Sequence, residues 1–251
     1  MNQPPTSNEV SLPIDASTVI VGRDSADGLE VLMLRKNSKI HFGGMWVFPG
    51  GRVDPEDHLD GGNPLPQGSD PMSAFRTAAI REANEEAGID LGGADLHHFS
   101  HWLPPAIRPK RFSTHFFFAA APSGLAEVAI DDQEIVDHAW ISPQMALERR
   151  SAGEIEFVTP TFVTLDWLRR HENTSSAIAD VSGPVCYHTH IQQVPDGMVA
   201  VYEGDVAFRD GANNTGDLSD EGPRRRCYML DSAWWWEEHD GAGNGPSPAT
   251  N

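Results

Sequence analysis

The chain has few cysteines and few basic residues. Its 251 residues include two cysteines, Cys186 and Cys227, which cannot form a disulfide framework and give no indication of an oxidising compartment. Lysine and arginine together number 18 against 37 aspartates and glutamates, so the formal net charge is −19. A surface this acidic repels nucleic acid, which is therefore not expected as a partner. A polyanionic substrate would need a local basic patch.

Long apolar runs and targeting signals are also missing. No stretch approaches the ~18 apolar residues of a membrane-spanning helix. The N-terminal MNQPPTSNEVSLPID has neither the basic start nor the apolar run of a signal peptide. We therefore expect a cytoplasmic protein without a membrane partner. The apolar fraction of 39% allows a packed core, in one large domain or in a domain of about 150 residues with an appendage.

Strand-like and helix-like segments alternate through the first two thirds of the chain. The longest helical pattern, at 69–88, has Asp70 as a possible cap, Pro71 in the first turn and Gly88 at the C-terminal end. Ser142 is expected to cap a second helix. The order of the elements indicates a mixed α/β domain. Strands are expected at 17–22, 29–34, 113–122 and 138–142, helices at 142–150 and 159–171, and further strands at 185–194, 198–203, 225–230 and 232–238.

These patterns divide the chain into segments of different character. The first 15 residues are rich in proline, serine and asparagine, and are expected to be flexible. A loop rich in glycine and proline occupies 57–70. We predict a flexible N-terminus at 1–15, an α/β domain at 16–175, a β-rich C-terminal extension at 176–240 and a disordered tail at 241–251.

The long helix carries an unusual group of carboxylates. At about 100° per residue, Glu82, Glu85 and Glu86 fall within one arc, apart from the apolar face, and no lysine is close to them in the sequence. Arg81 can pair with Glu85 one turn later. Oxygen ligands of this kind suit Mg²⁺ or Mn²⁺ rather than zinc. The alternative is an acidic helix face that only contacts solvent. The apolar side is expected to contain Met72, Ile80, Ala83 and Ala87.

A double glycine upstream of REANEEAGI resembles the Nudix box of the Nudix hydrolases, whose pattern is G-x5-E-x7-R-E-U-x-E-E-x-G-U with U aliphatic. The first half of the pattern departs from the family, because 30 positions instead of 14 separate Gly51 from Arg81, which implies an insertion of 16 residues. The first glutamate of the box then falls on Asp57 counted from Gly51, or on Ser73 counted from Arg81. The second half is matched by Arg81, Glu82, Ala83, Glu85, Glu86, Gly88 and Ile89.

The segments FGGMWVFPGGRVD, AFRTAAIREANEEAG and RPKRFSTHFFFAAAP together are similar to the subgroup that contains the peroxisomal coenzyme A diphosphatase, which also has a split box. The resemblance covers roughly residues 15–170. It implies a Nudix α/β/α sandwich with a mixed sheet, followed here by the β-rich C-terminal extension, and it places the loop 57–70 as an insertion within the box. The leucine–arginine run before a His-x-Gly, which marks coenzyme A hydrolysis, is only partly present in LRKNSKIHFGG.

The resemblance implies Mg²⁺-dependent hydrolysis of a nucleoside diphosphate linked to another group, with Mn²⁺ as a possible substitute. Coenzyme A or an acyl-coenzyme A is the favoured substrate, and ADP-ribose or a dinucleotide is the alternative. A non-catalytic Nudix regulator that binds a nucleotide is the alternative of another class. A homodimer is possible. The resemblance implies that the metal is held by Glu82, Glu85, Glu86 and the backbone carbonyl of Gly50. Arg81 is expected to be a catalytic residue beside them, and the general base is expected to be Glu85 or Glu134. Phosphate contacts are expected from Arg35, Arg108, Lys110 and Arg111.

Three further groups of residues are not absorbed by the resemblance. The strand pattern CYHTH puts Cys186, His188 and His190 on one face, but alternate residues are ~7 Å apart, too wide for one metal ion, so packing or surface roles are favoured. The three tryptophans at 234–236 are expected to alternate between the core and a partner surface rather than form a platform for a base. The histidines at 97, 98 and 101 fall in a loop-like stretch and receive no role.

Overall fold

A computed structural model describes residues 12–39, 43–66, 68–106, 110–125 and 127–241. The phosphate-contact candidate Arg108 lies outside the described residues, as do the first eleven residues and all but the first residue of the tail expected at 241–251. No helix in the described part of the chain is long and apolar enough to cross a membrane.

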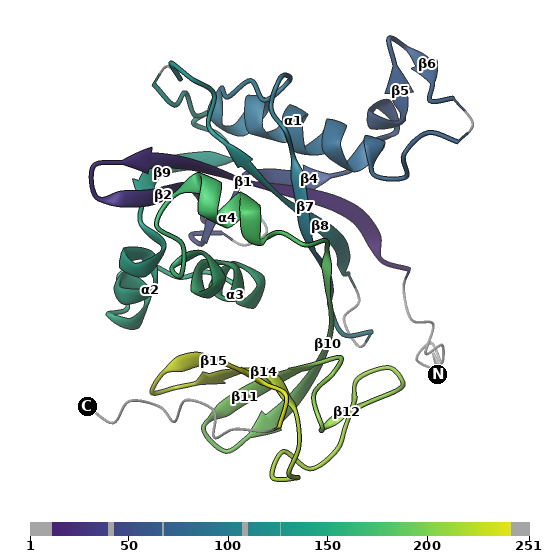
Figure 1. The fold of residues 1–251 in the computed structure, drawn as a ribbon, viewed down its shortest axis with the longest axis vertical. Helices are drawn as coiled ribbons and strands as arrows, with labels where there is room; N and C mark the ends of the chain where they lie inside the picture. The colour runs from purple at the N-terminus through teal and green to yellow at the C-terminus, as the bar shows by residue number, and fades with distance from the viewer. Residues whose placement is uncertain (1–11, 40–42, 67, 107–109, 126, 242–251) are drawn as a thin grey trace, which may run out of the picture.

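One mixed sheet organises the whole chain (Figure 1). It has 11 strands in the order β15-β14-β11-β10-β7-β8-β1-β2-β3, with β4 paired to β1 and β9 to β2. The β1–β8 and β7–β10 pairs are parallel and the others antiparallel. The strands are β1 (Ile14–Ser25), β2 (Gly28–Lys36), β3 (Trp46–Val47), β4 (Gly50–Arg52), β7 (His97–Leu103), β8 (Phe112–Ala120), β9 (Ile135–Ile141), β10 (Val185–Val194), β11 (Gly197–Tyr202), β14 (Arg224–Leu230) and β15 (Trp234–His239).

Helices cover both faces of the sheet, so the expected α/β/α sandwich is confirmed (Figure 1). Alternating residues of β1 and β2 point to opposite sides, and Val19 and Leu32 pack with α1, whereas Ile20 and Met33 pack with α2 and α3. This separation leaves α1 alone on one face, while the larger core forms on the other. The helices are α1 (Ser73–Ala87), α2 (Pro143–Ser151), α3 (Thr159–Leu168) and α4 (Thr174–Asp180).

The ends of α1 follow from local chemistry, with one difference from the prediction. Gly88 ends the helix in the left-handed conformation, with φ of 67°, as expected for a glycine there. Asp70 is not the N-cap, because α1 begins later, at Ser73, and Met72 occupies the cap position. The carboxylate of Asp70 instead accepts a hydrogen bond of 2.9 Å from the backbone N–H of Met72. In α2 the prediction holds, since Oγ of Ser142 accepts from the N–H of Met145.

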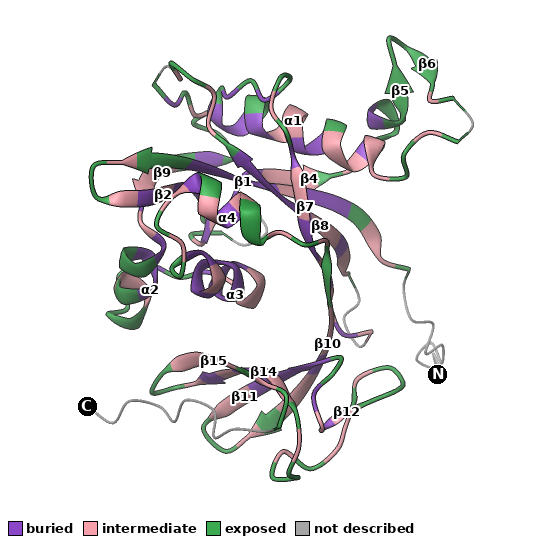
Figure 2. Cartoon of the chain, viewed as in Figure 1, coloured by how far each residue is buried: buried purple, intermediate pink, exposed green. Residues whose placement is uncertain are grey.

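The loop expected at 57–70 contains short regular elements. A single 3-10 turn, η1 (Pro55–His58), precedes the hairpin formed by β5 (Leu59–Asp60) and β6 (Asn63–Pro64). The hairpin is exposed and projects away from the sheet beyond the N-terminal end of α1 (Figure 2). The turn η1, by contrast, contacts α1 directly and buries Asp57.

The C-terminal strands extend the same sheet. Strand β10 pairs with β7 through its first residues and with β11 through its last, so it runs from the Nudix-like part into the C-terminal part (Figure 1). Trp236 is buried in the shared core, while Trp235 stacks on Tyr228 at 4.2 Å between ring centroids. Helix α4, which the sequence patterns missed, spans the boundary predicted at 175. The remaining pair is β12 (Phe208–Arg209) with β13 (Asn214–Thr215).

Candidate active site

The three glutamates of α1 differ strongly in exposure. Glu85 is exposed, with 58% of its side-chain area accessible, whereas Glu82 and Glu86 retain 14% and 6%. The expectation of an acidic face wholly apart from the packing face was therefore wrong for Glu86, which belongs to the buried side of α1 with Ala79 and Ala83. A carboxylate buried against a sheet must find partners there, because an unpaired buried charge is costly.

The double glycine supplies the first of these partners. The backbone N–H of Gly50 donates to Oε2 of Glu86 at 3.0 Å, which fixes that carboxylate against β4. At Gly51 a Cβ atom would overlap the carboxylate of Glu82. At Gly50 a Cβ atom would lie 2.5 Å from the carbonyl oxygen of Ser17. Both positions therefore require glycine, because a side chain at Gly51 would collide with Glu82 and a side chain at Gly50 would collide with strand β1.

Lys36 is the partner that sequence reasoning missed. It lies at the end of β2, 50 residues before Glu86, and its Nζ donates to Oε1 of Glu86 at 3.2 Å and to Oε1 of Glu134 at 2.6 Å. The prediction that no lysine is near the glutamates was wrong, because it considered only neighbours along the sequence. The alternation of side chains along β2 could have predicted this contact. It places Lys36 on the same face as Leu32 and Leu34, which pack against α1.

Burial and ion pairing act in opposite directions on these charges. Burial raises the pKa of Glu86 to about 7, although the charge of Lys36 and the N–H of Gly50 oppose the shift. Burial also raises the pKa of Glu82, against the influence of Arg81. For Lys36, burial alone would lower the pKa, but Glu86 and Glu134 outweigh it and the pKa is raised. Glu82 and Glu86 are therefore carboxylates held in a partly desolvated site, which strengthens their attraction for a cation.

Arg81 joins the carboxylates to the residues around them. Its Nη1 donates to Glu82 at 2.9 Å and to Glu85 at 3.0 Å, so the expected pairing with Glu85 is present. Its Nε and Nη2 donate to the two carboxylate oxygens of Asp57 at 3.1 and 2.9 Å. Asp57 is 1% exposed and also accepts from the backbone N–H of Asp54. Of the two positions counted for the first glutamate of the box, Asp57 is the one that contacts Arg81.

The predicted phosphate contacts lie in different places. Arg35 points to the face of β2 opposite Lys36 and pairs with Asp137 at 3.4 Å, so the structure does not bring it to the glutamates. Arg111 donates to the carbonyl of Pro104 before β8. Nζ of Lys110 lies 5.4 Å from the ring centroid of Phe112. The guanidinium carbon of Arg52 lies 6.0 Å from the centroid of the same ring. Arg52 directly follows Gly51, so it is a basic neighbour of the site that sequence reasoning missed.

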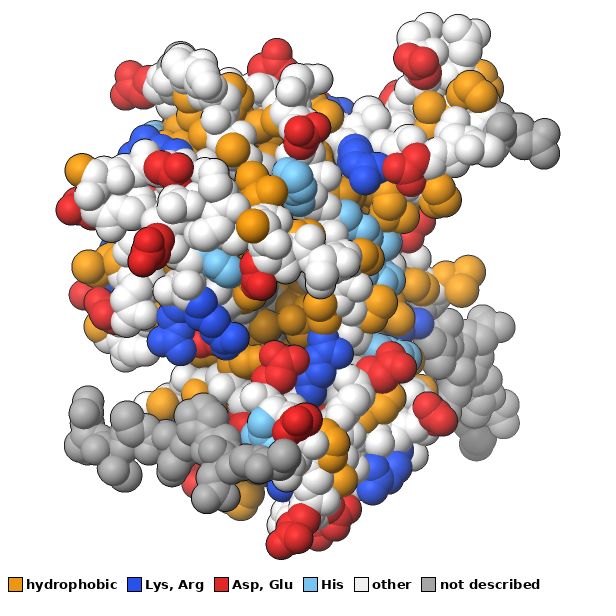
Figure 3. Space-filling model, viewed as in Figure 1, with side chains coloured by type: hydrophobic (Ala, Val, Ile, Leu, Met, Phe, Trp, Pro, Cys, Tyr) orange, Lys and Arg blue, Asp and Glu red, His pale blue; other side chains and the backbone are white. Residues whose placement is uncertain are grey.

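A row of histidines lies on the same face of the sheet as α1. Strand register aligns Gly51, Ser17, His115 and His101 across β4, β1, β8 and β7. His115 bonds to His98 at 2.9 Å and stacks on His101 at 4.1 Å between centroids. Figure 3 shows histidine side chains gathered beside β7 and β8. The prediction of a loop at 97–101 was wrong, because these residues belong to strand β7. This strand pairs with β8 and with β10, which is far away in the sequence.

Of the CYHTH residues, His190 is buried and Cys186 is exposed. Nδ1 of His190 donates to the carbonyl oxygen of Asn214 at 2.7 Å, and the ring stacks on Phe208 at 4.3 Å between centroids. Within the described ranges, no group of three or more histidine, cysteine, aspartate or glutamate residues is arranged so that it could hold a metal ion. This applies to CYHTH, for which packing or surface roles were favoured, and also to the glutamates of α1 in their present ion pairs.

A sequence model of the NUDIX domain matches residues 13–159, more than half of the chain. The chain belongs to the Nudix family. The expected class of protein, a Nudix hydrolase, is thereby confirmed. The matched region contains the glutamates of α1, the double glycine, Lys36 and Glu134, and it ends at the start of α3.

Two relatives illustrate the similarity. The acyl-coenzyme A diphosphatase NUDT19 of Gallus gallus is 25% identical over 131 residues, which are 49% of this chain and 35% of that protein. The chain thus matches about a third of the length of this curated relative. The crystal structure of a NUDIX hydrolase from Alicyclobacillus acidocaldarius superposes with a TM-score of 0.59 at 24% identity, covering 68% of this chain and 98% of that one. It supports the fold.

Nudix hydrolases generally use divalent metal ions, and the three carboxylates suit such an ion by their chemistry, while their present ion pairs do not arrange them around one. All three side chains offer carboxylate oxygens, which hard cations prefer. Gly51 leaves room against Glu82 that any side chain would fill. In this structure the three carboxylates pair with protein cations, Glu86 with Lys36 and both Glu82 and Glu85 with Arg81.

Proposed function

We propose that this Nudix domain hydrolyses the diphosphate bond of a nucleoside diphosphate linked to another group, with Mg²⁺ bound by Glu82, Glu85 and Glu86. One observation carries the proposal. The partly buried carboxylates of Glu82 and Glu86 are held against the double glycine by the N–H of Gly50 and by the cations Arg81 and Lys36. An acidic helix face that only meets solvent would not bury two carboxylates in this way.

The residues divide into three roles. Glu82, Glu85 and Glu86, with the backbone carbonyl of Gly50, are proposed to hold the metal, and Mn²⁺ is a possible substitute. The bound ion would neutralise the diphosphate and lower the pKa of water at the site. Arg81 orients Glu82 and Glu85 through its two hydrogen bonds from Nη1. Its anchor is Asp57, which holds the other side of the guanidinium.

Two residues are candidates for the general base. Glu85 is exposed on the acidic end of α1, so its carboxylate is accessible to a substrate. Glu134 directly precedes β9. It lies close to Glu86, because Nζ of Lys36 donates a hydrogen bond to both carboxylates. Replacing each by glutamine and comparing the pH dependence of turnover distinguishes them, since only the base removes a limb of the profile.

Coenzyme A or an acyl-coenzyme A is the substrate we favour. The support is the similarity to a protein named as an acyl-coenzyme A diphosphatase, which covers 131 residues. Lys110 and Arg52, on either side of the region around Phe112, are basic residues near the end of β4 that a phosphate-rich substrate could contact. Arg111 is a further candidate. ADP-ribose and dinucleotides contain the same diphosphate and are the alternatives.

A substrate panel tests the proposal. The full chain with Mg²⁺ is incubated with coenzyme A, ADP-ribose, NADH, a diadenosine polyphosphate and 8-oxo-dGTP, and the products are read by mass. We expect 3′,5′-ADP and phosphopantetheine from coenzyme A. Glu85→Gln should lose most of the activity while keeping its fold. Glu148→Gln, an exposed glutamate of α2 on the opposite face, is the matched control and should stay fully active.

Other outcomes have defined meanings. Cleavage of another member of the panel keeps the reaction and replaces the substrate. Binding of a nucleotide, seen as a rise in Tm, without any cleavage with Mg²⁺ or Mn²⁺ overturns hydrolysis in favour of a nucleotide-binding regulator. Full activity of Glu85→Gln overturns the proposed role of that carboxylate.

A further inference from the structure

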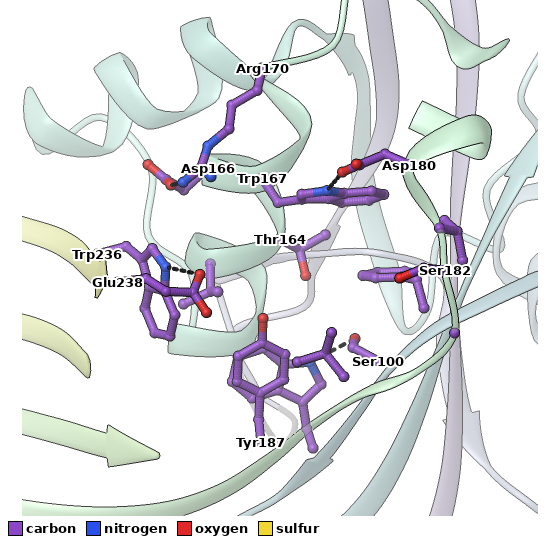
Figure 4. A pocket seen from close by; sticks show the side chains of 16 residues that line it. Ser100, Thr164, Asp166, Trp167, Arg170, Asp180, Ser182, Tyr187, Trp236 and Glu238 are labelled. Carbon is purple, nitrogen blue, oxygen red and sulfur yellow. Dashed lines mark hydrogen bonds and ion pairs between the residues drawn. The ribbon is translucent and has the colours of Figure 1, made fainter. Parts of the chain in front are cut away.

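A cavity of about 280 Å³ lies on the face of the sheet opposite α1. Its walls come from α3, the segment after α4, β7 and the C-terminal strands β10 and β15. We call it the α3–β15 pocket. Figure 4 shows Trp167 and Thr164 of α3 on one side, Tyr187 of β10 on the other, and Glu238 of β15 at one end. The pocket is separated from the glutamates of α1 by the sheet itself.

The pocket is a feature of this chain rather than of the Nudix domain. The family match ends at residue 159, at the first residue of α3, so the lining residues of every wall except β7 lie beyond it. The NUDIX hydrolase from Alicyclobacillus acidocaldarius is covered to 98% by only 68% of this chain. The C-terminal strands that close the pocket follow the matched Nudix region, and the reaction at the glutamates of α1 does not use the pocket.

A buried hydroxyl without a partner points into the pocket. Thr164 is 2% exposed, and its Oγ1 makes no hydrogen bond. In Figure 4 this oxygen points into the space between α3 and the hydroxyl-bearing end of Tyr187. A helix threonine usually satisfies its hydroxyl on the preceding turn of backbone. Leaving a buried hydroxyl unpaired is unfavourable, so a ligand that hydrogen-bonds to it recovers stabilisation that the free protein lacks.

Aromatic rings supply the apolar part of the walls. Trp102 stacks on Tyr187 at 3.9 Å between centroids, and Trp167 stacks on Phe99 at 5.0 Å. These pairs stiffen the walls, because each ring is held by its neighbour. A small, largely apolar molecule would be buried between them without reorganising the core.

Carboxylates outnumber basic groups in the lining. Asp166, Asp180 and Glu238 line the pocket together with one guanidinium, that of Arg170. Asp166 is neutralised by Arg169 and Arg170, each at 2.7 Å.

Asp180 differs, because within the described residues it has no lysine or arginine partner. Its contacts are the indole N–H of Trp167 at 2.7 Å and the ring of His171 at 3.4 Å. Glu238 similarly accepts from the indole N–H of Trp236 at 3.1 Å, and Arg225 lies 3.5 Å away. Glu238 is therefore neutralised by Arg225, whereas Asp180 is held by the indole N–H of Trp167 and keeps a negative charge that a ligand can pair with.

We propose that the α3–β15 pocket binds a small organic cation, a protonated primary amine with an apolar body. The apolar body packs between the aromatic walls. The ammonium group donates to Oγ1 of Thr164 and pairs with the carboxylate of Asp180. The carboxylate of Asp180, which no lysine or arginine of the described residues neutralises, disfavours an anion such as a nucleotide phosphate, so the ligand differs in class from the substrate of the Nudix site.

Binding of three matched probes to the full chain tests the proposal. They are phenethylamine, its neutral analogue 2-phenylethanol and the anion phenylacetate, each followed by titration calorimetry and by tryptophan fluorescence. We expect one equivalent of phenethylamine to bind, with at least tenfold weaker binding of 2-phenylethanol and none of phenylacetate. A charge-assisted hydrogen bond is worth about tenfold or more in affinity.

Variants place the bound amine. Asp180→Asn keeps an oxygen for the indole N–H and should weaken phenethylamine at least tenfold, while Thr164→Val should weaken it severalfold and leave the protein folded, since it only removes an unpaired hydroxyl. Asp60→Asn, an exposed aspartate of β5 on the far side of the molecule, should bind as the wild type does. Loss of binding in Glu85→Gln instead would put the amine at the Nudix site and overturn the proposal. Equal affinity for all three probes, wild-type affinity in both pocket variants, or no saturable binding would overturn it as well.

Discussion

Both carboxylate oxygens of Asp57 accept hydrogen bonds from the guanidinium of Arg81, across 24 residues of sequence that include the exposed hairpin β5–β6. The pair raises the pKa of Arg81 above its ordinary value, chiefly through these hydrogen bonds. Arg81 in turn holds Glu82 and Glu85. The short turn η1 therefore connects the insertion to the proposed metal site, because it is the element that places Asp57 against α1.

Asp57→Asn should lower turnover by about 10- to 100-fold, the range found when a group that orients metal ligands is lost. The substitution keeps one oxygen acceptor, so the fold should persist with a slightly lower Tm. Steady-state kinetics at several Mg²⁺ concentrations are the measurement, and the apparent Mg²⁺ affinity should fall with the activity. Glu56→Gln, the neighbouring acid in the same turn, is the control. Unchanged kinetics in Asp57→Asn would exclude an orienting role.

Gly51→Ala should reduce activity strongly without unfolding the protein. The new methyl group would overlap the end of the Glu82 side chain, which is flexible enough to move away but would then leave its position beside β4. We expect weaker Mg²⁺ binding and at least tenfold slower turnover. Gly93→Ala is the matched control, since a Cβ atom at Gly93 meets no atom within 4 Å. Equal activity of the two variants would show that Glu82 does not act from its present position.

Lys36→Met should alter the site through two carboxylates at once. It leaves Glu86 and Glu134 without the ammonium group that lies 3.2 and 2.6 Å from them. Since Lys36 opposes the raised pKa of Glu86, its removal should raise that pKa further and move the acidic limb of the pH–rate profile to higher pH. Turnover as a function of pH is the measurement. Lys39→Met, an exposed lysine nearby in the sequence, should keep the wild-type profile.

His115 should make the protein less stable in mild acid. Burial, followed by the charges of His101 and His98, lowers the pKa of His115 from its ordinary 6.5 to about 4. The folded state then binds fewer protons than the unfolded state, so this stabilisation is complete above pH 6.5 and is lost as the pH falls toward 4. Because the ring is partly exposed, the expected effect is reduced to about 1 kcal/mol.

Urea unfolding at pH 7, 5.5 and 4.5 measures this effect. His115→Gln should lose less unfolding free energy than the wild type between pH 7 and 4.5. His58→Gln, an exposed histidine of η1, should follow the wild type. A His115→Gln slope as steep as the wild-type slope would contradict the prediction.

Asp205→Asn should destabilise the C-terminal strands. The carboxylate of Asp205 accepts hydrogen bonds from Nε and Nη2 of Arg226 at 2.7 and 2.5 Å, and the side chain of Arg226 is fully buried. Removing one charge leaves the other uncompensated, which costs about 3–5 kcal/mol of unfolding free energy. Chemical denaturation at pH 7 tests this. Asp220→Asn, whose carboxylate pairs with Arg209 at 3.6 Å on the surface, should change the stability by less than about 0.5 kcal/mol.

The sequence by itself determined the features that depend on local chemistry. The helix that carries Glu82, Glu85 and Glu86 is formed by its own apolar spacing and ended by Gly88, and Ser142 caps α2 through a contact three residues away. The pairing of Arg81 with Glu85 follows from one turn of helix. The Nudix family itself was recognisable because the second half of its box is a continuous stretch.

Tertiary structure alone decided what these residues meet. Lys36 reaches Glu86 only because β2 lies beside α1, and Asp57 is distinguished from Ser73 only because η1 folds back onto the helix. The strand β7 exists because β8 and β10 pair with it on either side, which no local pattern announces. The α3–β15 pocket likewise combines segments 80 and more residues apart. Hydrogen bonds and packing between distant segments stabilise the protein only after the intervening chain has brought those segments together. The local sequence therefore does not reveal them.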